Sequence, residues 1–408
     1  MQRRHDIDAL RALAFALVIL YHVAMYYVAG WHWHLKSPDA ATWLQWPMRA
    51  LNLWRMDLVF LVSGLAFGFL QRGGTGRPGL LRQRSWRLLL PLAFGMLVVV
   101  PFQPYAQALA NGSTGPGFVD FLRRYFGGGP WPRGAFDGSD FGITWNHLWY
   151  LPYLWLYTAA LLLVLPWLRQ GAGARLHAAF LRLRGWRLVA WPLAPLALWS
   201  LLLWPHFPPT HDLVGDAWLH AVYFTLFLYG WWIGVDAGWW AEVLRLRWNL
   251  LALSGAAFVA YLTLRALASG PTLAARLAAD LYLWTTVLAL LGWAHRLLNR
   301  PWRWLPWANE SVYPWYVLHQ TVIIVLVFWL APLRWPAVLE APVVVAGTIL
   351  GCWGLTAVIR RSRWLRPLFG LPAVRPPAPP RCPSPAWPAP PAAHSGGSPG
   401  RPCPPGTS

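Results

Sequence analysis

The sequence is poor in charged residues, and the shortage is greatest for acidic ones. Only 12% of the 408 residues are charged, Asp and Glu number 14 against 34 Lys and Arg, and 57% are hydrophobic. This composition excludes an ordinary soluble domain and is typical of a polytopic membrane protein. The formal charge of +20 does not favour nucleic-acid binding, because the arginines stand at the ends of apolar runs, where membrane topology alone places basic residues.

Cysteine is scarce as well. The three cysteines are Cys352, Cys382 and Cys403, an odd number with two in a proline-rich terminal segment. This pattern argues against a disulfide scaffold and against a thiolate metal site, so we expect no metal ion and no tightly bound cofactor. A cleavable signal is also not expected, because Arg3 and Arg4 precede a full-length apolar run without a small-residue cleavage site.

Long apolar runs are abundant. A bilayer core needs roughly 20 apolar residues per helix, and the sequence predicts an all-α integral membrane protein with a bundle of about ten transmembrane helices. Many of the 32 tryptophans stand near the predicted helix ends, where indole rings favour the headgroup level. The predicted helices cover residues 9–29, 52–70, 86–104, 146–168, 187–204, 217–235, 249–266, 279–298, 311–332 and 340–360.

The arginines also predict the topology. Alternate loops are rich in arginine, whereas residues 205–216 contain none, so both termini are expected in the cytoplasm. Residues 105–145 form a long glycine-rich external loop that could cover an entrance. We divide the chain into a membrane domain, 1–366, and a proline-rich cytoplasmic tail, 367–408, whose composition predicts disorder.

The first helix carries an arginine and a histidine in the segment RALAFALVILYH. Arg11 and His22 are eleven positions apart, which returns to within roughly 20° of one helix face and separates them by about 16 Å along the axis. Arg11 then lies at the cytoplasmic boundary and His22 in the outer half of the bilayer. Ionisable groups in such helices usually face a cavity. The alternatives are that Arg11 is a topology signal and that His22 only bonds a neighbouring helix.

The second helix places a carboxylate at a similar depth. Asp57 lies a turn or two below the outer face and could orient an imidazole that acts as a general base. An equally open reading is that Asp57 pairs with Arg55 or caps the helix. Ser63 and Gly64, which follow on the same helix, favour close helix packing over a catalytic role.

Other ionisable residues stand at the ends or in the middle of the remaining helices. Arg84 and Arg87 share a face at the cytoplasmic entrance of the third helix and suit phosphate groups, although topology explains them equally well. His147 begins the fourth helix, while Glu310 and His319 lie near the cytoplasm and at mid-depth in the ninth. Taken singly, each histidine is more often a buried structural residue than a catalyst.

Five motifs in this order resemble the membrane-bound acyltransferase-3 family, and within it the glucans biosynthesis protein C type. They are DALRALAFALVILYH, DLVFLVSG, RSWRLLLP, HLWYL and YPWYVLHQ. The resemblance covers about residues 5–365 and implies transfer of acyl groups from cytoplasmic acyl-coenzyme A to acceptors, commonly sugars, across the membrane. Some relatives carry an appended esterase-like domain. We see none in this sequence, so we expect the membrane domain to complete the transfer itself or with a partner. The proline-rich tail has no counterpart in the family pattern.

The resemblance also assigns roles to individual residues. It implies that His22 is catalytic, that Arg11 accompanies it, and that Arg84 and Arg87 lie near the donor. We therefore expect an O-acyltransferase of the bacterial inner membrane that moves an acetyl or succinyl group from acyl-coenzyme A to an envelope carbohydrate, possible partners being other proteins of glycan biosynthesis. Asp57 is expected to orient His22, while His147, Glu310 and His319 are expected to bind substrate. A transporter or flippase for an anionic lipid or sugar is the alternative, because a polar path through the membrane also suits transport.

Overall fold

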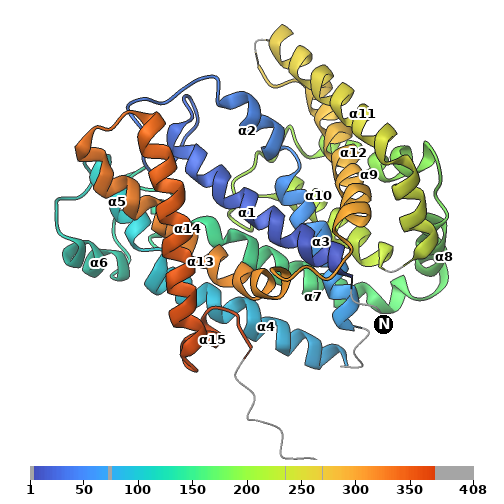
Figure 1. Ribbon diagram of the computed structural model, residues 1–408, viewed down its shortest axis with the longest axis horizontal. Helices are drawn as coiled ribbons and strands as arrows, with labels where there is room; N and C mark the ends of the chain where they lie inside the picture. The colour runs from blue at the N-terminus through green and yellow to red at the C-terminus, as the bar shows by residue number, and fades with distance from the viewer. Residues whose placement is uncertain (1–3, 72–75, 235, 269, 373–408) are drawn as a thin grey trace, which may run out of the picture. The chain divides into compact units, whose positions relative to one another are not determined.

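The structure is a computed structural model that describes residues 4–71, 76–234, 236–268 and 270–372 (Figure 1). Within these ranges the chain is helical and contains no β-strand; one isolated bridge joins Val28 and Ala41. The long helices are α1 (His5–Tyr27), α3 (Arg55–Gln71), α4 (Arg77–Phe94), α7 (Tyr150–Leu168), α9 (Arg187–Leu202), α10 (Ala217–Ile233), α11 (Ala237–Leu267), α12 (Leu273–Leu298), α13 (Leu305–Leu330) and α14 (Ala337–Arg361). The shorter ones are α2 (Gln45–Asn52), α5 (Phe102–Ala110), α6 (Phe118–Phe126), α8 (Gly171–Leu181) and α15 (Leu365–Leu368).

Each of the ten predicted segments overlaps one of the long helices, which confirms a helical integral membrane bundle. The third segment, 86–104, runs past the end of α4 into α5. Seven helices of the described ranges are long and apolar enough to cross a bilayer, and a bent pair could form an eighth span. Helices α9 and α10 have 16 and 17 residues, fewer than the roughly 20 that a straight crossing takes. The number of crossings and the location of the termini therefore stay predictions.

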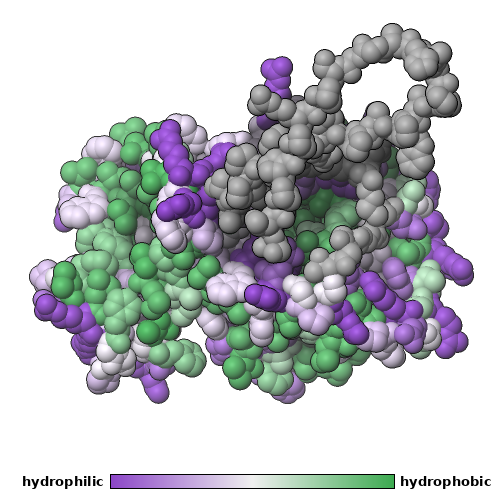
Figure 2. Space-filling model, turned by 90° about the horizontal axis from the view of Figure 1, so that it is seen from below, coloured by the Kyte–Doolittle hydropathy of each residue, from purple (hydrophilic) through white to green (hydrophobic). Residues whose placement is uncertain are grey.

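The outer surface of the bundle is apolar. Leu163 of α7, Val259 of α11 and Leu350 of α14 are 81%, 62% and 65% exposed, which would be unfavourable in water and is expected where helices face lipid. Figure 2 shows broad apolar areas on one face, interrupted by groups of hydrophilic residues.

Helix α1 lies inside the bundle, with α3, α12 and α13 packed against it (Figure 1). The neighbouring helices α3 and α10 pack closely because a glycine on each of them lies against the backbone of the other. A Cβ on Gly64 would come within 1.9 Å of the carbonyl oxygen of Phe227, and one on Gly230 within 1.9 Å of that of Leu61. The expected packing role of Gly64 is thereby confirmed.

The polypeptide bends after α4. Pro91 lies inside that helix, the π-helical turn Gly95–Val99 follows, and α5 then departs at 42° from the line of the Arg77–Val99 segment. Proline and π-helical turns are the usual causes of such bends. The bend brings the amides of Gln103 and Gln107, both on α5, into the polar site described below.

The folded unit extends to Pro372. Phe369 and Leu371 are buried against it, so the folded chain continues a few residues past the expected boundary at 366. Residues 373–408, the larger part of the predicted tail, lie outside the described residues.

Candidate active site

The first-helix histidine pairs with a histidine of α13. Nδ1 of His22 lies 2.8 Å from Nε2 of His319, and the two rings are stacked with centroids 5.0 Å apart. His319 is fully buried. Its other nitrogen, Nδ1, lies 3.0 Å and 2.9 Å from the carbonyl oxygens of Trp315 and Tyr316. The side chain of His319 is therefore held at both nitrogens.

These contacts determine the tautomers of the pair. A carbonyl oxygen only accepts, so Nδ1 of His319 must carry the hydrogen and the Nε2 of a neutral ring must accept. His22 then donates its Nδ1–H to His319. The basic lone pair of His22 is left on Nε2, which makes no hydrogen bond with the described residues. A neutral imidazole with an available nitrogen, oriented through its other nitrogen, is the arrangement that a general base requires.

The expected orienting residue, Asp57, occupies a different place. It is buried and lines, together with His22, a cavity of about 390 Å³ between α1, α3, α10 and α12. The hydrogen bond to Nδ1 of His22 is made by His319. Asp57 therefore lies at the same cavity as His22, but the residue that bonds Nδ1 of the imidazole in this structure is His319.

The arginines of α1 and α4 meet at the end of the bundle where α1 begins. Arg11, Arg84 and Arg87 line one cavity of about 430 Å³. Arg11 donates from Nη2 to Oδ1 of Asn309 at 2.9 Å, and Arg84 lies over the ring of Phe67. Three guanidinium groups around one cavity form a site suited to a polyanion such as a phosphate ester.

Glu310 lines the same cavity, but its carboxylate is paired within the protein. Its oxygens lie 2.6 Å from Arg360 and 3.2 Å from Arg366. These ion pairs attach the end of α14 and the following segment to α13. Substrate binding by Glu310 therefore stays a prediction, and the geometry gives the residue a role in closing the cavity wall.

Aromatic side chains lie between the arginine cavity and His22. The rings of Phe15, Tyr150 and Tyr316 all line the arginine cavity and lie 5.5 to 6.2 Å apart. The hydroxyl of Tyr150 is held 2.5 Å from that of Ser63. Phe15 stands four residues after Arg11 and seven before His22, so all three share one stripe of α1. We call these three rings the aromatic barrier.

Beyond the barrier, His22 faces a larger cavity of about 690 Å³ at the opposite end of the bundle. Most of its lining comes from the segment that follows α1 and from the two segments that precede α7 and α10. Its walls combine tryptophans with acidic and amide side chains: Trp33, Trp145, Trp149, Asp137, Asp140, Asp212, Asn146 and Gln320. Such a lining suits a neutral, hydroxyl-rich ligand.

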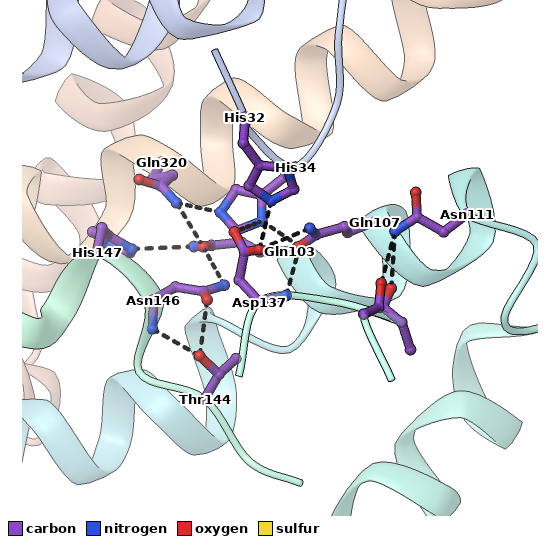
Figure 3. Close-up of polar contacts among 12 residues, drawn as sticks. His32, His34, Gln103, Gln107, Asn111, Asp137, Thr144, Asn146, His147 and Gln320 are labelled. Atoms are coloured by element: carbon purple, nitrogen blue, oxygen red, sulfur yellow. Dashed lines mark hydrogen bonds and ion pairs between the residues drawn. The ribbon is translucent and has the colours of Figure 1, made fainter. Parts of the chain in front are cut away.

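A hydrogen-bonded network joins these segments (Figure 3). Gln320, next to His319 on α13, donates to Nε2 of His34 at 2.9 Å and to Oε1 of Gln103 at 3.0 Å. His34 donates from Nδ1 to Oε1 of Gln107 at 2.7 Å, and Gln107 donates to Asp137 at 3.0 Å. The network ties the cavity wall to the helix that orients His22.

The electrostatics of this wall favour an anionic Asp137 and a neutral His34. Burial would raise the pKa of Asp137, but the neighbouring His34 and the hydrogen bonds from His32 and Gln107 hold that pKa below its ordinary value. Burial lowers the pKa of His34, against the opposing effects of Asp137 and Gln107. Asp137 is 42% exposed and can accept hydrogen bonds from a ligand.

His147 also reaches this region, although both of its nitrogens are engaged. Nε2 donates to the carbonyl oxygen of Val317 at 3.1 Å, which leaves Nδ1 to accept from Gln103 at 3.3 Å. The hydroxyl of Tyr316 donates to the backbone oxygen of His147 at 2.6 Å. These bonds position α13 against α7, while binding of substrate by His147 stays a prediction.

Several functional candidates escaped the sequence analysis. Asp137 lies in a glycine-rich loop, and Gln103, Gln107 and Gln320 are amides whose importance depends on partners distant in sequence. One available signal was the HQ dipeptide that places Gln320 beside His319. In the described part of the chain, no three His, Cys, Asp or Glu side chains are arranged to hold a metal ion.

Comparison with known proteins identifies the family of the chain. A family model described as an acyltransferase domain matches residues 4–357. The chain belongs to the acyltransferase-3 family. The match spans all ten long helices except the end of α14, so the multi-pass membrane protein is an acyltransferase. Comparisons with curated proteins and with solved structures gave no match.

Proposed function

We propose that this membrane acyltransferase moves an acetyl or succinyl group from cytoplasmic acyl-coenzyme A to a hydroxyl of a cell-envelope carbohydrate. The proposal rests mainly on the position of His22. It stands between an arginine-lined cavity at one end of the bundle and an aromatic, acidic cavity at the other. The proposed location is the bacterial inner membrane, with the arginine cavity on the cytoplasmic side.

The donor would bind through its phosphates. Arg84, Arg87 and Arg11 provide the cationic groups that the nucleotide part of coenzyme A requires, with the pantetheine arm directed toward His22. The aromatic barrier lies on that route, so its rings must separate for the thioester to reach His22. At other times the closed barrier keeps water from the donor side away from the catalytic nitrogen.

The acceptor would bind on the other side. Tryptophan rings such as Trp149 can stack on the apolar faces of a sugar ring, and Asp137 and Asn146 can bond its hydroxyls. The cavity of about 690 Å³ is within the range of small-molecule sites. Carboxylates in its wall disfavour an anionic acceptor, which supports a neutral carbohydrate.

The chemistry follows from the tautomer of His22. Nε2 takes the proton of the acceptor hydroxyl as the hydroxyl oxygen attacks the thioester carbonyl, and the hydrogen bond to His319 stabilises the imidazolium that forms. The C–S bond then breaks, and the leaving thiolate takes the proton from the imidazolium, which releases coenzyme A as a free thiol and restores neutral His22. A variant with a transient acyl-histidine uses the same geometry.

The test compares two substitutions of His22 in the purified full-length protein. His22→Ala should leave the protein inserted and folded, because little packing is lost beside a cavity, and should lower acyl transfer by about two orders of magnitude or more. His22→Gln keeps hydrogen-bonding capacity but is no base at neutral pH, so it should not restore transfer.

The readouts are release of free coenzyme A thiol and mass spectrometry of envelope glycans. Parental transfer by His22→Gln would contradict the mechanism. A wild-type protein that moves an envelope lipid or sugar across the bilayer without releasing thiol would instead establish the transporter alternative.

A further inference from the structure

The smaller cavity beside His22 contains an arginine that the proposed mechanism has not used. Arg55 is the first residue of α3, and only 6% of it is exposed. Together with Asp57, Tyr223 and His22 it lines the cavity of about 390 Å³. A guanidinium is always charged, and burying one at membrane depth is costly unless it is paired or used.

The guanidinium of Arg55 lies next to the catalytic residue. Its Cζ is 3.6 Å from the ring centroid of Tyr21, and the ring of Tyr21 meets that of His22 edge-on at 5.9 Å. The hydroxyl of Tyr21 is held by Asn52 at 3.1 Å. The stacking of Arg55 on a fixed ring keeps the cation on the side of His22 where α3 and α10 enclose the cavity.

Arg55 differs from the other arginine of this cavity in its hydrogen bonds. Arg276 makes bonds of 3.1 Å and 2.5 Å to Asp280, so its charge is compensated. Nε and Nη1 of Arg55 have no hydrogen-bond partner among the described residues, and Arg55 makes no ion pair there. A buried group left in this state calls for an explanation.

We propose that Arg55 stabilises the negative charge that develops on the acyl carbonyl oxygen during transfer at His22. This inference rests on the proposed function. When the acceptor oxygen attacks, the carbonyl oxygen becomes an oxyanion. The C=O bond re-forms as the C–S bond breaks, and the negative charge leaves on the sulfur of coenzyme A. A fixed cation with spare N–H donors in a low-dielectric cavity is the group that lowers the energy of this state.

The competing explanation is structural, with Arg55 serving only to hold Tyr21 by a cation–π contact. The two explanations predict different kinetics. Loss of an oxyanion donor lowers kcat and leaves ground-state binding almost unchanged, whereas collapse of the cavity wall impairs both.

The experiment uses Arg55→Met and Arg55→Lys in the full-length protein. Arg55→Met should lower kcat by about 10²–10³ with little change in the KM for acyl-coenzyme A. Arg55→Lys keeps the charge and should lose less. An S-alkyl coenzyme A thioether, which lacks the carbonyl oxygen, should bind to Arg55→Met as to the parent. The matched control is Arg49→Met, since Arg49 also stacks on an aromatic ring, Trp31, but does not line the cavity; it should keep the parental kcat.

Each other result overturns the inference. Parental kcat in Arg55→Met would show that the cation is dispensable. Equal losses of kcat and thioether binding, or aggregation of both variants during size-exclusion chromatography, would assign Arg55 to the fold. The proposed function fails separately, through an active His22→Ala or a wild type that releases no thiol.

Discussion

Replacing His319 with leucine tests the tautomer argument directly. Leucine fills much of the same buried space but cannot accept the Nδ1–H of His22. The carbonyl oxygens of Trp315 and Tyr316 lose a side-chain donor, but they lie in α13 and keep their helical bonds. The expected effect is therefore on catalysis more than on folding.

The magnitude follows from the bond that is lost. During transfer His22 becomes an imidazolium, so its bond to His319 is a charge-assisted one, worth about 1.5–3 kcal/mol. At 1.36 kcal/mol per factor of ten, kcat should fall by about 10- to 150-fold. The KM for acyl-coenzyme A should change little, because the bond strengthens only in the transition state.

A second substitution serves as the control. His319→Gln can place an amide oxygen near the former Nε2, accept the same hydrogen and restore part of the rate. Asp57→Asn should cost less than His319→Leu, because Asp57 makes no bond to Nδ1 of His22. The assay is initial-rate thiol release by protein that elutes as one peak. Parental kcat in His319→Leu, or equal rates for the leucine and glutamine variants, would refute the reasoning.

The other predictions concern the donor site, the topology and the pH dependence. Arg84→Gln combined with Arg87→Gln should mainly raise the KM for acyl-coenzyme A in initial-rate assays; unchanged donor affinity would leave both residues as topology signals. Reporters fused after residues 212 and 175 should lie outside and inside respectively, and the reverse at either point would exclude a cytoplasmic donor site. Burial holds the pKa of His34 in the folded protein below 6.5, its ordinary value. As the pH falls, His34 is therefore protonated in the unfolded chain at a higher pH than in the folded protein, and protonation favours unfolding. The melting temperature in detergent should therefore decrease below about pH 6.5, and the decrease should be smaller in His34→Gln than in the parent protein. Equal decreases in the two proteins would show that other groups cause the effect.

The helices could be predicted from sequence because apolar length and breaker residues are local signals. All ten predicted segments overlap long helices, and the close contact expected at Gly64 is present. The bend after α4 was not predicted, since a π-helical turn depends on packing as well as on Pro91. The short helices α2, α6 and α8 were also missed, because pieces of 8 to 11 residues have no membrane-length signal.

Only the part of the site that lies on a single helix could be predicted from the sequence. The spacing of Arg11 and His22 depends on α1 alone, and the structure places them at the arginine cavity and at the histidine pair. The partner of His22 depends on which helix packs beside α1 at that depth. The sequence predicted a suitable depth for Asp57, but the packing of α13 against α1 makes His319 the partner of His22.

In the proposed mechanism the aromatic barrier separates His22 from water on the donor side. A water molecule that reached His22 could take the place of the acceptor hydroxyl and hydrolyse the thioester, so the proposed donor path needs a seal as well as a binding site. Phe15 lies on the same stripe as Arg11 and His22, so a single helix carries an arginine of the proposed donor cavity, a ring of the aromatic barrier and the proposed base. Tyr316 lies three residues before His319 on α13; its ring is part of the aromatic barrier, and its backbone oxygen accepts from His319. A shift of α13 that opened the barrier would therefore also move the residue that orients His22, which links donor entry to the activation of the base.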